Sequence, residues 1–402
     1  MSRIPVRPAL AGVAAVLLSA LTTLSGPVPV ARAAPGCASP LAPARPVTAT
    51  PWPQYRYAPE RLAPLTDGSG VTVAVVDSGV DPRHPQLAGR VLAGTDLLDP
   101  NGDGRRDCVG HGTGVASIIA ATPRDGVAFR GLAPGVRILP VRVSEQQVVD
   151  GRESGRTVDA ADFARAVRWA VDRDADVLNL SVVLYADDPA VRAAVAHALA
   201  RDVVVVAAAG NLHGSGDPRP YPAAYDGVLG VGAISADGSR ADFSQTGTYV
   251  DLVAPGSDVV VCAPGQGHHR AEGTSYAAPF VAATAALLRG YRPELTAAEV
   301  TRRLVSTADP APDGGYGAGV LNPYRAVTES PATRLDRARP AAGIGDDRVD
   351  PAVLAQRARR AAARDRAFVV AGVGVTVVAA AGALALLAPR GSRRRWRPAD
   401  PA

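Results

Sequence analysis

The sequence has no lysine, so its 43 basic residues are all arginines. Against 38 acidic residues they leave a formal net charge of only +5 over 402 residues, and many of the arginines lie near the C-terminus. This balance does not predict a nucleic-acid partner. The composition, with 47% hydrophobic and 20% charged residues, excludes a disordered or collagen-like chain. The length allows one large domain with additional segments, or two domains.

Several motifs that bind cofactors or metals are also missing. The sequence contains no P-loop, no HExxH motif and no dinucleotide-binding fingerprint, which argues against nucleotide or zinc chemistry. Asp99–Gly104 begins like a calcium loop, but Gly110 stands at the position of the closing glutamate, and this favours a polar turn. His268 and His269 have no third ligand at metal spacing, which favours solvated loop residues over a metal pair. We expect no metal site and no required cofactor, with calcium as the less favoured alternative.

The N-terminus has the features of a secretory signal peptide. Two early arginines precede an apolar region at about residues 9–24, and small residues around Ala33 offer a cleavage site. We expect residues 1–33 to be a signal peptide that exports the following chain. The alternative is an uncleaved N-terminal anchor.

A second long apolar segment lies near the C-terminus. Residues 367–388 carry no charge and as a helix would span about 33 Å, enough to cross a bilayer. A buried core helix is the alternative, but the segment is too long and too uniformly apolar to favour it. Arginines flank both ends, so the positive-inside rule alone does not orient the helix, whereas an exported N-terminus does. We expect a linker at residues 331–366, one transmembrane helix at 367–388 and a short basic cytoplasmic tail at 389–402, with the main domain outside the cell membrane.

Cysteine is scarce, with only Cys37, Cys108 and Cys262. A disulfide is permitted outside the cytoplasm. Because three is an odd number, at least one thiol is free or pairs with another chain.

Between the two apolar segments the chain alternates strands with helices. Residues 34–64 are rich in proline and alanine and predict an extended arm, and residues 65–330 form the main domain. Val71–Val80 is a near-continuous β-branched run, typical of a buried strand in a parallel sheet. The alternation predicts an α/β fold with a doubly wound, mostly parallel sheet flanked by helices. Further strands are expected at residues 137–143, 176–183, 203–211 and 228–234, and two short strands within 249–261. Helices are expected after residue 110 and at 157–173, 188–201, 275–288 and 296–308.

Three polar residues stand where this fold places its sites, at the carboxyl ends of strands or the starts of helices. Asp77 follows a strand, and His111 and Ser275 each begin a helix. Ser275 could be only a helix cap. As a nucleophile it needs a base, and the base needs an orienting carboxylate. His111 and Asp77 fit those roles, and the order Asp, His, Ser is that of subtilisin.

A tetrahedral intermediate also needs donors for its oxyanion. Asn211 ends the strand of "AAAGN", and its side-chain amide could donate to the developing charge, a role worth about 3 kcal/mol. The backbone N–H of Ser275, at a helix N-terminus, is the expected second donor.

Four stretches together resemble a known family. "VAVVDSGVDPRHPQL", "GHGTGVASIIA", "AAAGN" and "GTSYAAPFVAATAALL" resemble the signature blocks of the subtilisin-like serine proteases. By this resemblance Asp77, His111, Asn211 and Ser275 match the family's aspartate, histidine, oxyanion asparagine and nucleophile. It covers about residues 71–326 and implies a serine endopeptidase acting on proteins or peptides.

The flanking segments narrow the resemblance. A signal peptide, a proline-rich arm with a cysteine, "CVGHGT" beside the histidine and a C-terminal transmembrane helix resemble the mycosins, membrane-anchored subtilases associated with type VII (ESX) secretion. This resemblance implies a disulfide between Cys37 and Cys108 and leaves Cys262 without a partner. It also leaves two roles open: limited proteolysis linked to secretion, or a scaffold that stabilises a secretion complex with proteolysis secondary. A third reading, an α/β binding domain without chemistry, requires the four blocks to be accidental.

The resemblance also points to residues that bind substrate. We expect Ser181, Val183, Ala209 and Gly210 to line the substrate strand and its pocket. The family pattern usually has a glycine where Val183 stands, so a side chain there should narrow the pocket for the residue before the scissile bond. Substrate backbone would add as an antiparallel strand.

Overall fold

The computed structural model describes residue 37 and residues 44–149, 152–312 and 314–329. The predicted signal peptide, linker, transmembrane helix and cytoplasmic tail lie outside these residues. None of the helices within the described ranges is long and apolar enough to cross a membrane. All described residues belong to the first of two units of the chain, Met1–Ala332.

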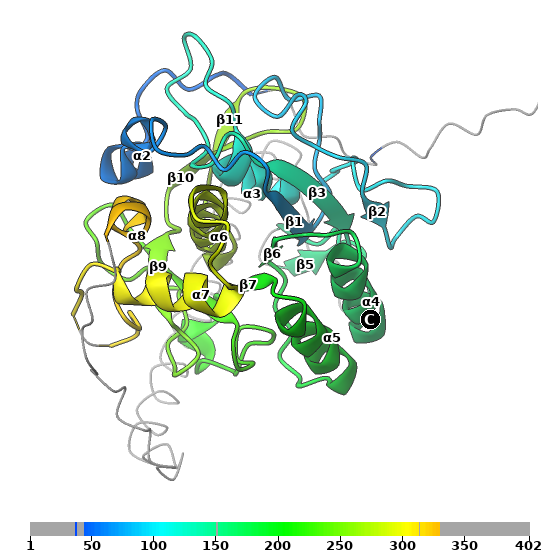
Figure 1. The fold of residues 1–402 in the computed structure, drawn as a ribbon. Helices are drawn as coiled ribbons and strands as arrows, with labels where there is room; N and C mark the ends of the chain where they lie inside the picture. The colour runs from blue at the N-terminus through cyan, green and yellow to red at the C-terminus, as the bar shows by residue number, and fades with distance from the viewer. Residues whose placement is uncertain (1–36, 38–43, 150–151, 313, 330–402) are drawn as a thin grey trace, which may run out of the picture. The chain divides into compact units, whose positions relative to one another are not determined.

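A seven-stranded sheet, parallel throughout, organises this unit (Figure 1). Strand β1, Thr72–Asp77, lies between β3 and β6, and its six residues are all buried. The near-continuous apolar run predicted such a strand because both of its faces are covered. The sheet order is β2-β3-β1-β6-β7-β8-β9. The other strands are Thr95–Asp96 (β2), Arg137–Arg142 (β3), Val177–Leu180 (β6), Val204–Ala208 (β7), Leu229–Ile234 (β8) and Leu252–Pro255 (β9).

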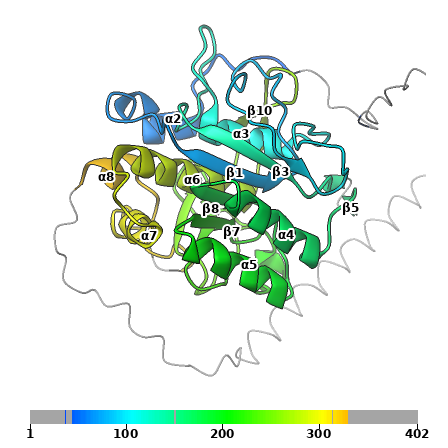
Figure 2. The same cartoon turned by 45° about the vertical axis from the view of Figure 1, so that its right-hand side comes forward.

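Helices cover both faces of the sheet (Figures 1 and 2). On one face, Ala74 and Val76 of β1 pack in a core with α4, Ala160–Val171, and α5, Pro189–Ala200. On the other, Val73 and Val75 pack with helices α3, His111–Ala120, and α6, Thr274–Tyr291. The alternation follows from the two-residue period of a strand. The predicted doubly wound α/β architecture is therefore confirmed for the described residues.

Helix boundaries follow local capping signals. Asp188 caps α5 ahead of Pro189, and Thr296 forms a capping box with Glu299 at the start of α7, Ala297–Ser306. The last described helix, α8, is Pro323–Thr328.

The N-terminal arm differs from its prediction as extended chain. It contains helix α2, Trp52–Tyr57, and a 3-10 turn, Pro59–Arg61. Tyr57 is buried in the main core, and Trp52 packs against it while donating from Nε1 to the Ser257 carbonyl at 3.1 Å. Packing of these aromatic side chains orders a segment that has little periodicity of its own.

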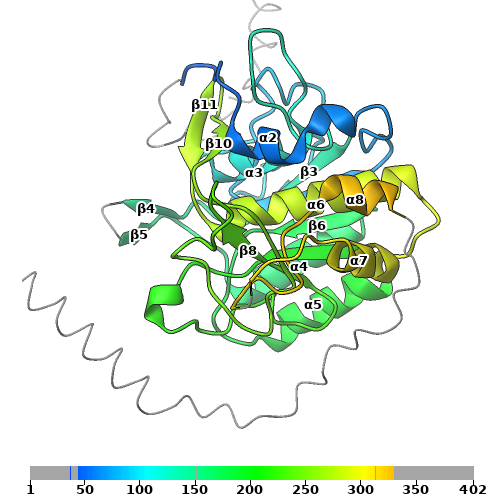
Figure 3. The same ribbon diagram turned by 90° about the vertical axis from the view of Figure 1, so that its left-hand side faces the viewer.

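Three further features differ from the sequence prediction, although the second short strand expected within 249–261 is present as Val259–Cys262. Strand β6 ends at Leu180, so the expected strand at 176–183 is shorter at both ends. Two antiparallel hairpins lie outside the sheet (Figure 3). They pair Gln147–Val149 (β4) with Arg152–Ser154 (β5), and Val259–Cys262 (β10) with His268–Ala271 (β11).

A buried ion pair lies at the carboxyl end of β3. The Arg142 side chain is fully buried, its Nη1 lies 2.6 Å from Asp96 Oδ2, and it also contacts Glu145. Because Asp96 is itself 5% exposed, its charge has little access to water.

We expect Arg142→Met to destabilise the fold by about 3–5 kcal/mol, since it removes the short ion pair of the buried Asp96 carboxylate and leaves only the longer contact with Arg106 at 3.9 Å. Denaturant unfolding would measure this loss. Adding Asp96→Leu should restore most of the stability. A loss below about 1 kcal/mol for the single variant would show that the pair does not balance a buried charge.

Candidate active site

Asp77 is placed by the sheet itself. It is the last residue of β1, the strand between β3 and β6, and it is 2% exposed. Its Oδ1 accepts from the backbone N–H of Ser78 at 2.6 Å. The carboxylate therefore stands at the edge where parallel strands end, as the sequence predicted.

His111 begins helix α3 and approaches this edge through glycines. Gly110 caps the helix with φ of +79°, a conformation that glycine adopts without strain. A Cβ on Gly112 would lie 2.2 Å from the Gly79 carbonyl oxygen. The two glycines therefore let the helix approach the loop after β1.

Asp77, His111 and Ser275 form a continuous hydrogen-bonded chain. His111 Nδ1 lies 2.7 Å from Asp77 Oδ1, and His111 Nε2 lies 2.9 Å from Ser275 Oγ. Ser275 lies in the first turn of α6. The side chain of His111 is 29% exposed. The three residues predicted as nucleophile, base and orienting carboxylate are thus brought together in the geometry that those roles require.

The charge of Asp77 acts on the imidazole. Burial lowers the pKa of His111, but the charge and hydrogen bond of the Asp77 carboxylate, together with the charge of Asp107, outweigh burial, so the net shift is upward from 6.5. The Tyr276 ring packs against the imidazole at 4.9 Å between centroids, and burial raises the pKa of its hydroxyl. A protonated His111, the species formed when a base takes the serine proton, is therefore stabilised in place.

Asn211 lies beside Ser275 with its amide oriented. Its Oδ1 accepts from both the backbone N–H and the hydroxyl of Thr274, each at 2.9 Å. A Cβ on Gly273 would lie 3.0 Å from Ser275 Oγ and 3.3 Å from Asn211 Nδ2. Gly273, with φ of +142°, therefore leaves open a space bordered by the serine oxygen and the amide nitrogen.

Asp107 is a residue of the site that the sequence analysis missed. This buried carboxylate accepts from the backbone N–H groups of Val109, Gly110 and Thr113, and from the hydroxyls of Thr113 and Ser78. Burial raises its pKa, whereas these donors favour the ionised form. An aspartate just before a helix is a capping signal, so "DCVGHGT" could have predicted that Asp107 holds the start of α3.

Among the residues expected to bind substrate, several polar groups already form hydrogen bonds within the protein. Ser181 follows β6, and its hydroxyl donates to the Ser275 carbonyl at 3.1 Å. That carbonyl lacks a helical partner because Pro279, four residues on, has no N–H. Ala209 and Gly210 donate their backbone N–H groups to Val231 O and Thr274 Oγ1.

Val183 lies on the same segment as Ser181 and is half-buried. The next residue, Leu184, forms an antiparallel bridge with Tyr221. Binding of substrate by Ser181, Val183, Ala209 and Gly210 stays a prediction.

The disulfide predicted from the resemblance is present. Cys37 and Cys108 are joined, with their Cα atoms 5.2 Å apart, so the arm is tied to the chain three residues before His111. Cys262 is a buried free cysteine, and burial raises the pKa of its thiol.

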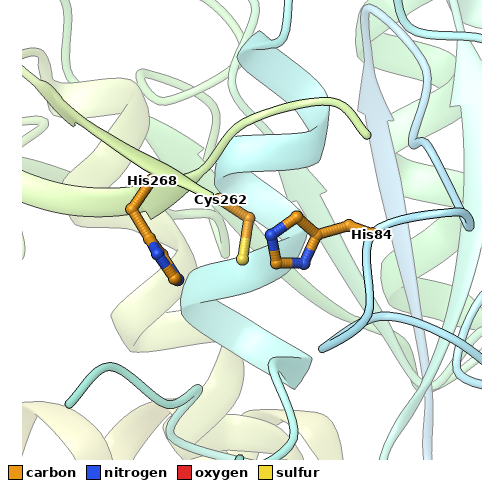
Figure 4. A group of neighbouring side chains, drawn as sticks. All are labelled: His84, Cys262 and His268. Carbon is orange, nitrogen blue, oxygen red and sulfur yellow. The ribbon is translucent and has the colours of Figure 1, made fainter. Parts of the chain in front are cut away.

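Cys262 belongs to a polar cluster that the sequence did not predict. Figure 4 shows its sulfur between the imidazoles of His84 and His268, and one ligating atom from each of the three residues lies within 4.8 Å of the others. His268 and His269 were expected in a solvated loop, but both are half-buried on strand β11. Two members of the cluster were missed as candidate ligands: Cys262, six positions before His268, and His84, which is distant in sequence.

The hydrogen bonds of this cluster favour neutral imidazoles over metal ligands. The Nδ1 atoms of His84 and His268 accept from the backbone N–H groups of Gln86 and Val47, each at 3.2 Å. Their Nε2 atoms then carry the protons and donate to Gly267 O at 3.1 Å and Gln86 Oε1 at 2.7 Å. A metal on Nε2 would place a proton on each Nδ1, facing another donor.

The segment that begins like a calcium loop is a turn whose carboxylates contact arginines. Asp103 pairs with Arg105 at 2.5 Å and Asp99 with Arg106 at 3.3 Å.

The order of aspartate, histidine and serine on a parallel sheet is the arrangement of the subtilisin-like serine peptidases, a class of hydrolases. The chain belongs to this family, because the model of Peptidase S8, the Subtilase family, matches residues 68–319.

The chain is similar to several individual members of the family. It is 39% identical over 263 residues to a thermophilic serine proteinase from a Bacillus species, covering 65% of this chain and 62% of the relative. It is 38% identical over 302 residues to Mycosin-4 of Mycobacterium tuberculosis, covering 65% of this chain and 66% of the relative. The chain thus spans just under two thirds of these curated relatives. The solved structure of the MycP3 protease from the type VII (ESX-3) secretion system aligns with a TM-score of 0.62 at 33% identity, covering 74% of this chain and 96% of that one.

We expect the His111 imidazole to titrate above 6.5, because the Asp77 carboxylate stabilises its protonated form. Asp77→Asn should lower the midpoint, whereas Asp237→Asn, in an exposed turn whose carboxylate bonds to Ser239, should not change it. NMR of the chain with 15N-labelled histidine would measure these midpoints, with His111→Gln identifying the signal. A parent midpoint at or below 6.5 would contradict this electrostatic account.

A second titration concerns folding stability. Burial, together with the neighbouring His84 and His269, lowers the pKa of His268 from 6.5 to about 4. The unfolded chain therefore takes up a proton on His268 near pH 6.5, and the folded chain only near pH 4, so the stabilising contribution of neutral His268 is lost as the pH falls through this window.

His268→Gln, which keeps one acceptor and one donor but does not titrate, should lose less stability than the parent between pH 7 and pH 4. Thermal unfolding at several pH values would measure the difference. Parallel pH dependences for the two proteins would rule out this effect of His268.

Proposed function

We propose that this chain is a serine endopeptidase anchored at the outer side of the cell membrane, with Asp77, His111 and Ser275 as its catalytic triad. The observation that carries the proposal is the hydrogen-bonded chain of 2.7 Å and 2.9 Å that joins the three side chains. Membership of the subtilase family supports the same reaction class.

In the first step the Ser275 hydroxyl attacks the carbonyl carbon of a peptide bond. His111 Nε2 accepts the hydroxyl proton, and Asp77 accepts a hydrogen bond from Nδ1–H and stabilises the imidazolium. The carbonyl oxygen becomes an oxyanion in the space beside Gly273. Asn211 Nδ2 borders that space, and the Ser275 N–H lies in the first turn of α6, where N–H groups have no partner within the helix.

In the second step His111 returns its proton to the leaving amine, and the C–N bond breaks to leave an acyl ester on Ser275. Water then attacks the ester while His111 again acts as base, which releases the new carboxyl terminus and restores the serine. Every proton in this cycle moves through His111, and the residues required belong to the described part of the chain.

The substrate is proposed to be a protein or peptide bound as an extended strand beside Ser181 and Gly210. The side chain of Val183 should restrict the pocket, which supports limited processing rather than general degradation. Membrane attachment rests on the apolar segment at residues 367–388. A link to type VII secretion is supported by the similarity to Mycosin-4 and to the MycP3 protease of the ESX-3 system.

A scaffold within a secretion complex is a second candidate role. One similar solved structure, 30% identical with a TM-score of 0.62, is described as MycP1, a serine protease and an essential component of the type VII (ESX-1) secretion system. An essential component could act through its surface as well as through its chemistry.

We expect a fluorophosphonate serine probe to label the full chain in detergent, and Ser275→Ala to abolish the labelling, since Ser275 Oγ is the nucleophile. Gel fluorescence would detect the covalent product, and circular dichroism would show that the variant is folded. Labelling that persists in Ser275→Ala would place the reactive serine elsewhere.

The same variant separates the two roles in the host organism. If secretion stops with Ser275→Ala while the protein level stays normal, proteolysis is required. Secretion that continues with Ser275→Ala but stops when the gene is deleted would favour the scaffold.

A further inference from the structure

A buried glutamine lies beneath the loop that carries Asn211. Gln245, between β8 and β9, is 0% exposed. Its backbone N–H donates to Gly210 O at 3.1 Å, and its Oε1 accepts from the Leu212 N–H at 3.2 Å. Gly210 and Leu212 are the residues on either side of Asn211. Gln245 therefore binds the peptide groups that flank the amide proposed to stabilise the oxyanion.

The conformation of Gly210 makes room for this side chain. Gly210 has φ of +92°, and a Cβ there would lie 2.1 Å from Gln245 Oε1. Any other residue would displace the amide and strain the backbone. The glycine of "AAAGN" and the glutamine, 35 positions later, are thus sterically matched, although nothing in the local sequence links them.

The rest of the amide is held from the opposite side. Nε2 donates to Pro218 O at 2.6 Å and to the Tyr249 hydroxyl at 3.3 Å. Tyr185, two residues after Val183 on the expected pocket segment, donates from its hydroxyl to Oε1 at 3.1 Å. With donors and acceptors both satisfied in a buried site, Gln245 has one favoured orientation.

From these contacts we infer that Gln245 is a positioning residue for Asn211: it holds the loop so that the Asn211 amide is aligned for the oxyanion before substrate binds. The inference rests on the proposed function. A loop held by buried hydrogen bonds needs no reorganisation when charge develops, and such preorganisation makes an oxyanion donor effective. Thr274 orients the Asn211 side chain, and Gln245 fixes the backbone that carries it.

The test is a double-mutant cycle in the full chain in detergent, with the second-order rate constant for a fluorophosphonate probe as readout. Gln245→Met keeps the side-chain size but cannot form the hydrogen bonds of the amide. Asn211→Ala should lower the rate constant by about 100-fold or more. Gln245→Met should lower it by about tenfold or more in the parent, but less than about twofold in the Asn211→Ala background, because its effect acts through Asn211.

Gln86→Met is the matched control. Gln86 is also a buried glutamine, 1% exposed, that donates to two backbone carbonyls, but it lies in the His84–Cys262–His268 cluster. It should reduce thermal stability without changing the rate constant. Two outcomes would overturn the inference in favour of a purely structural role. One is an equal loss of rate constant in Gln245→Met and Gln86→Met. The other is a double variant of Gln245→Met and Asn211→Ala whose loss is the product of the two single losses.

A readout independent of reactivity separates this inference from the proposed function. Amide hydrogen exchange of Leu212 should accelerate by tenfold or more in Gln245→Met and remain unchanged in Gln86→Met. If the folded parent is not labelled at all, the proposed function fails, and unchanged exchange at Leu212 would still overturn the positioning role. If Gln245→Met does not fold, Tyr185→Phe replaces it in the test. This variant, at an exposed position, removes one hydrogen-bond donor to Gln245 Oε1. It should lower the rate constant by a smaller factor, and this loss should also be absent in the Asn211→Ala background.

Discussion

The parallel pairing of β1 with β3 and β6 is the constraint on which the candidate site depends. Parallel strands end at the same edge of a sheet, which places Asp77 there at the end of β1. This arrangement brings Asp77 within hydrogen-bond distance of His111, 34 positions later, and brings His111 within reach of Ser275, 164 positions beyond that. Helices α3 and α6 cover the same face, so their first turns meet over the end of β1.

The groups that position the site are buried more deeply than Ser275 and His111. Asp107, Thr274 and Gln245 are 5%, 0% and 0% exposed, and the side chain of each accepts a hydrogen bond from a backbone N–H next to His111 or Asn211. A buried polar group without a partner is costly, so these side chains have few alternative orientations. These contacts hold the backbone beside His111 and Asn211, while Thr274 also binds Asn211 Oδ1 and leaves Asn211 Nδ2 beside the space at Gly273.

The arm and the β10–β11 hairpin are joined at His268. Val47 of the arm donates to His268, and the backbone N–H of His268 donates to the Arg45 carbonyl, so arm and hairpin are hydrogen-bonded together. The Cys37–Cys108 disulfide attaches the earlier part of the arm close to His111. Any movement of the arm would therefore act on both the hairpin and the start of α3.

The local sequence by itself determined the α/β class, most strands and helices, and the residues Asp77, His111, Asn211 and Ser275, because apolar periodicity, capping residues and strand-end polar residues are local signals. It also contained a capping signal for Asp107 that was not used. Only the tertiary structure decided that Gln245 lies under Gly210, that Cys262 lies between His84 and His268, and that the arm contains a helix. Those contacts join residues far apart in the chain, and their partners meet only when the sheet and its covering helices have packed.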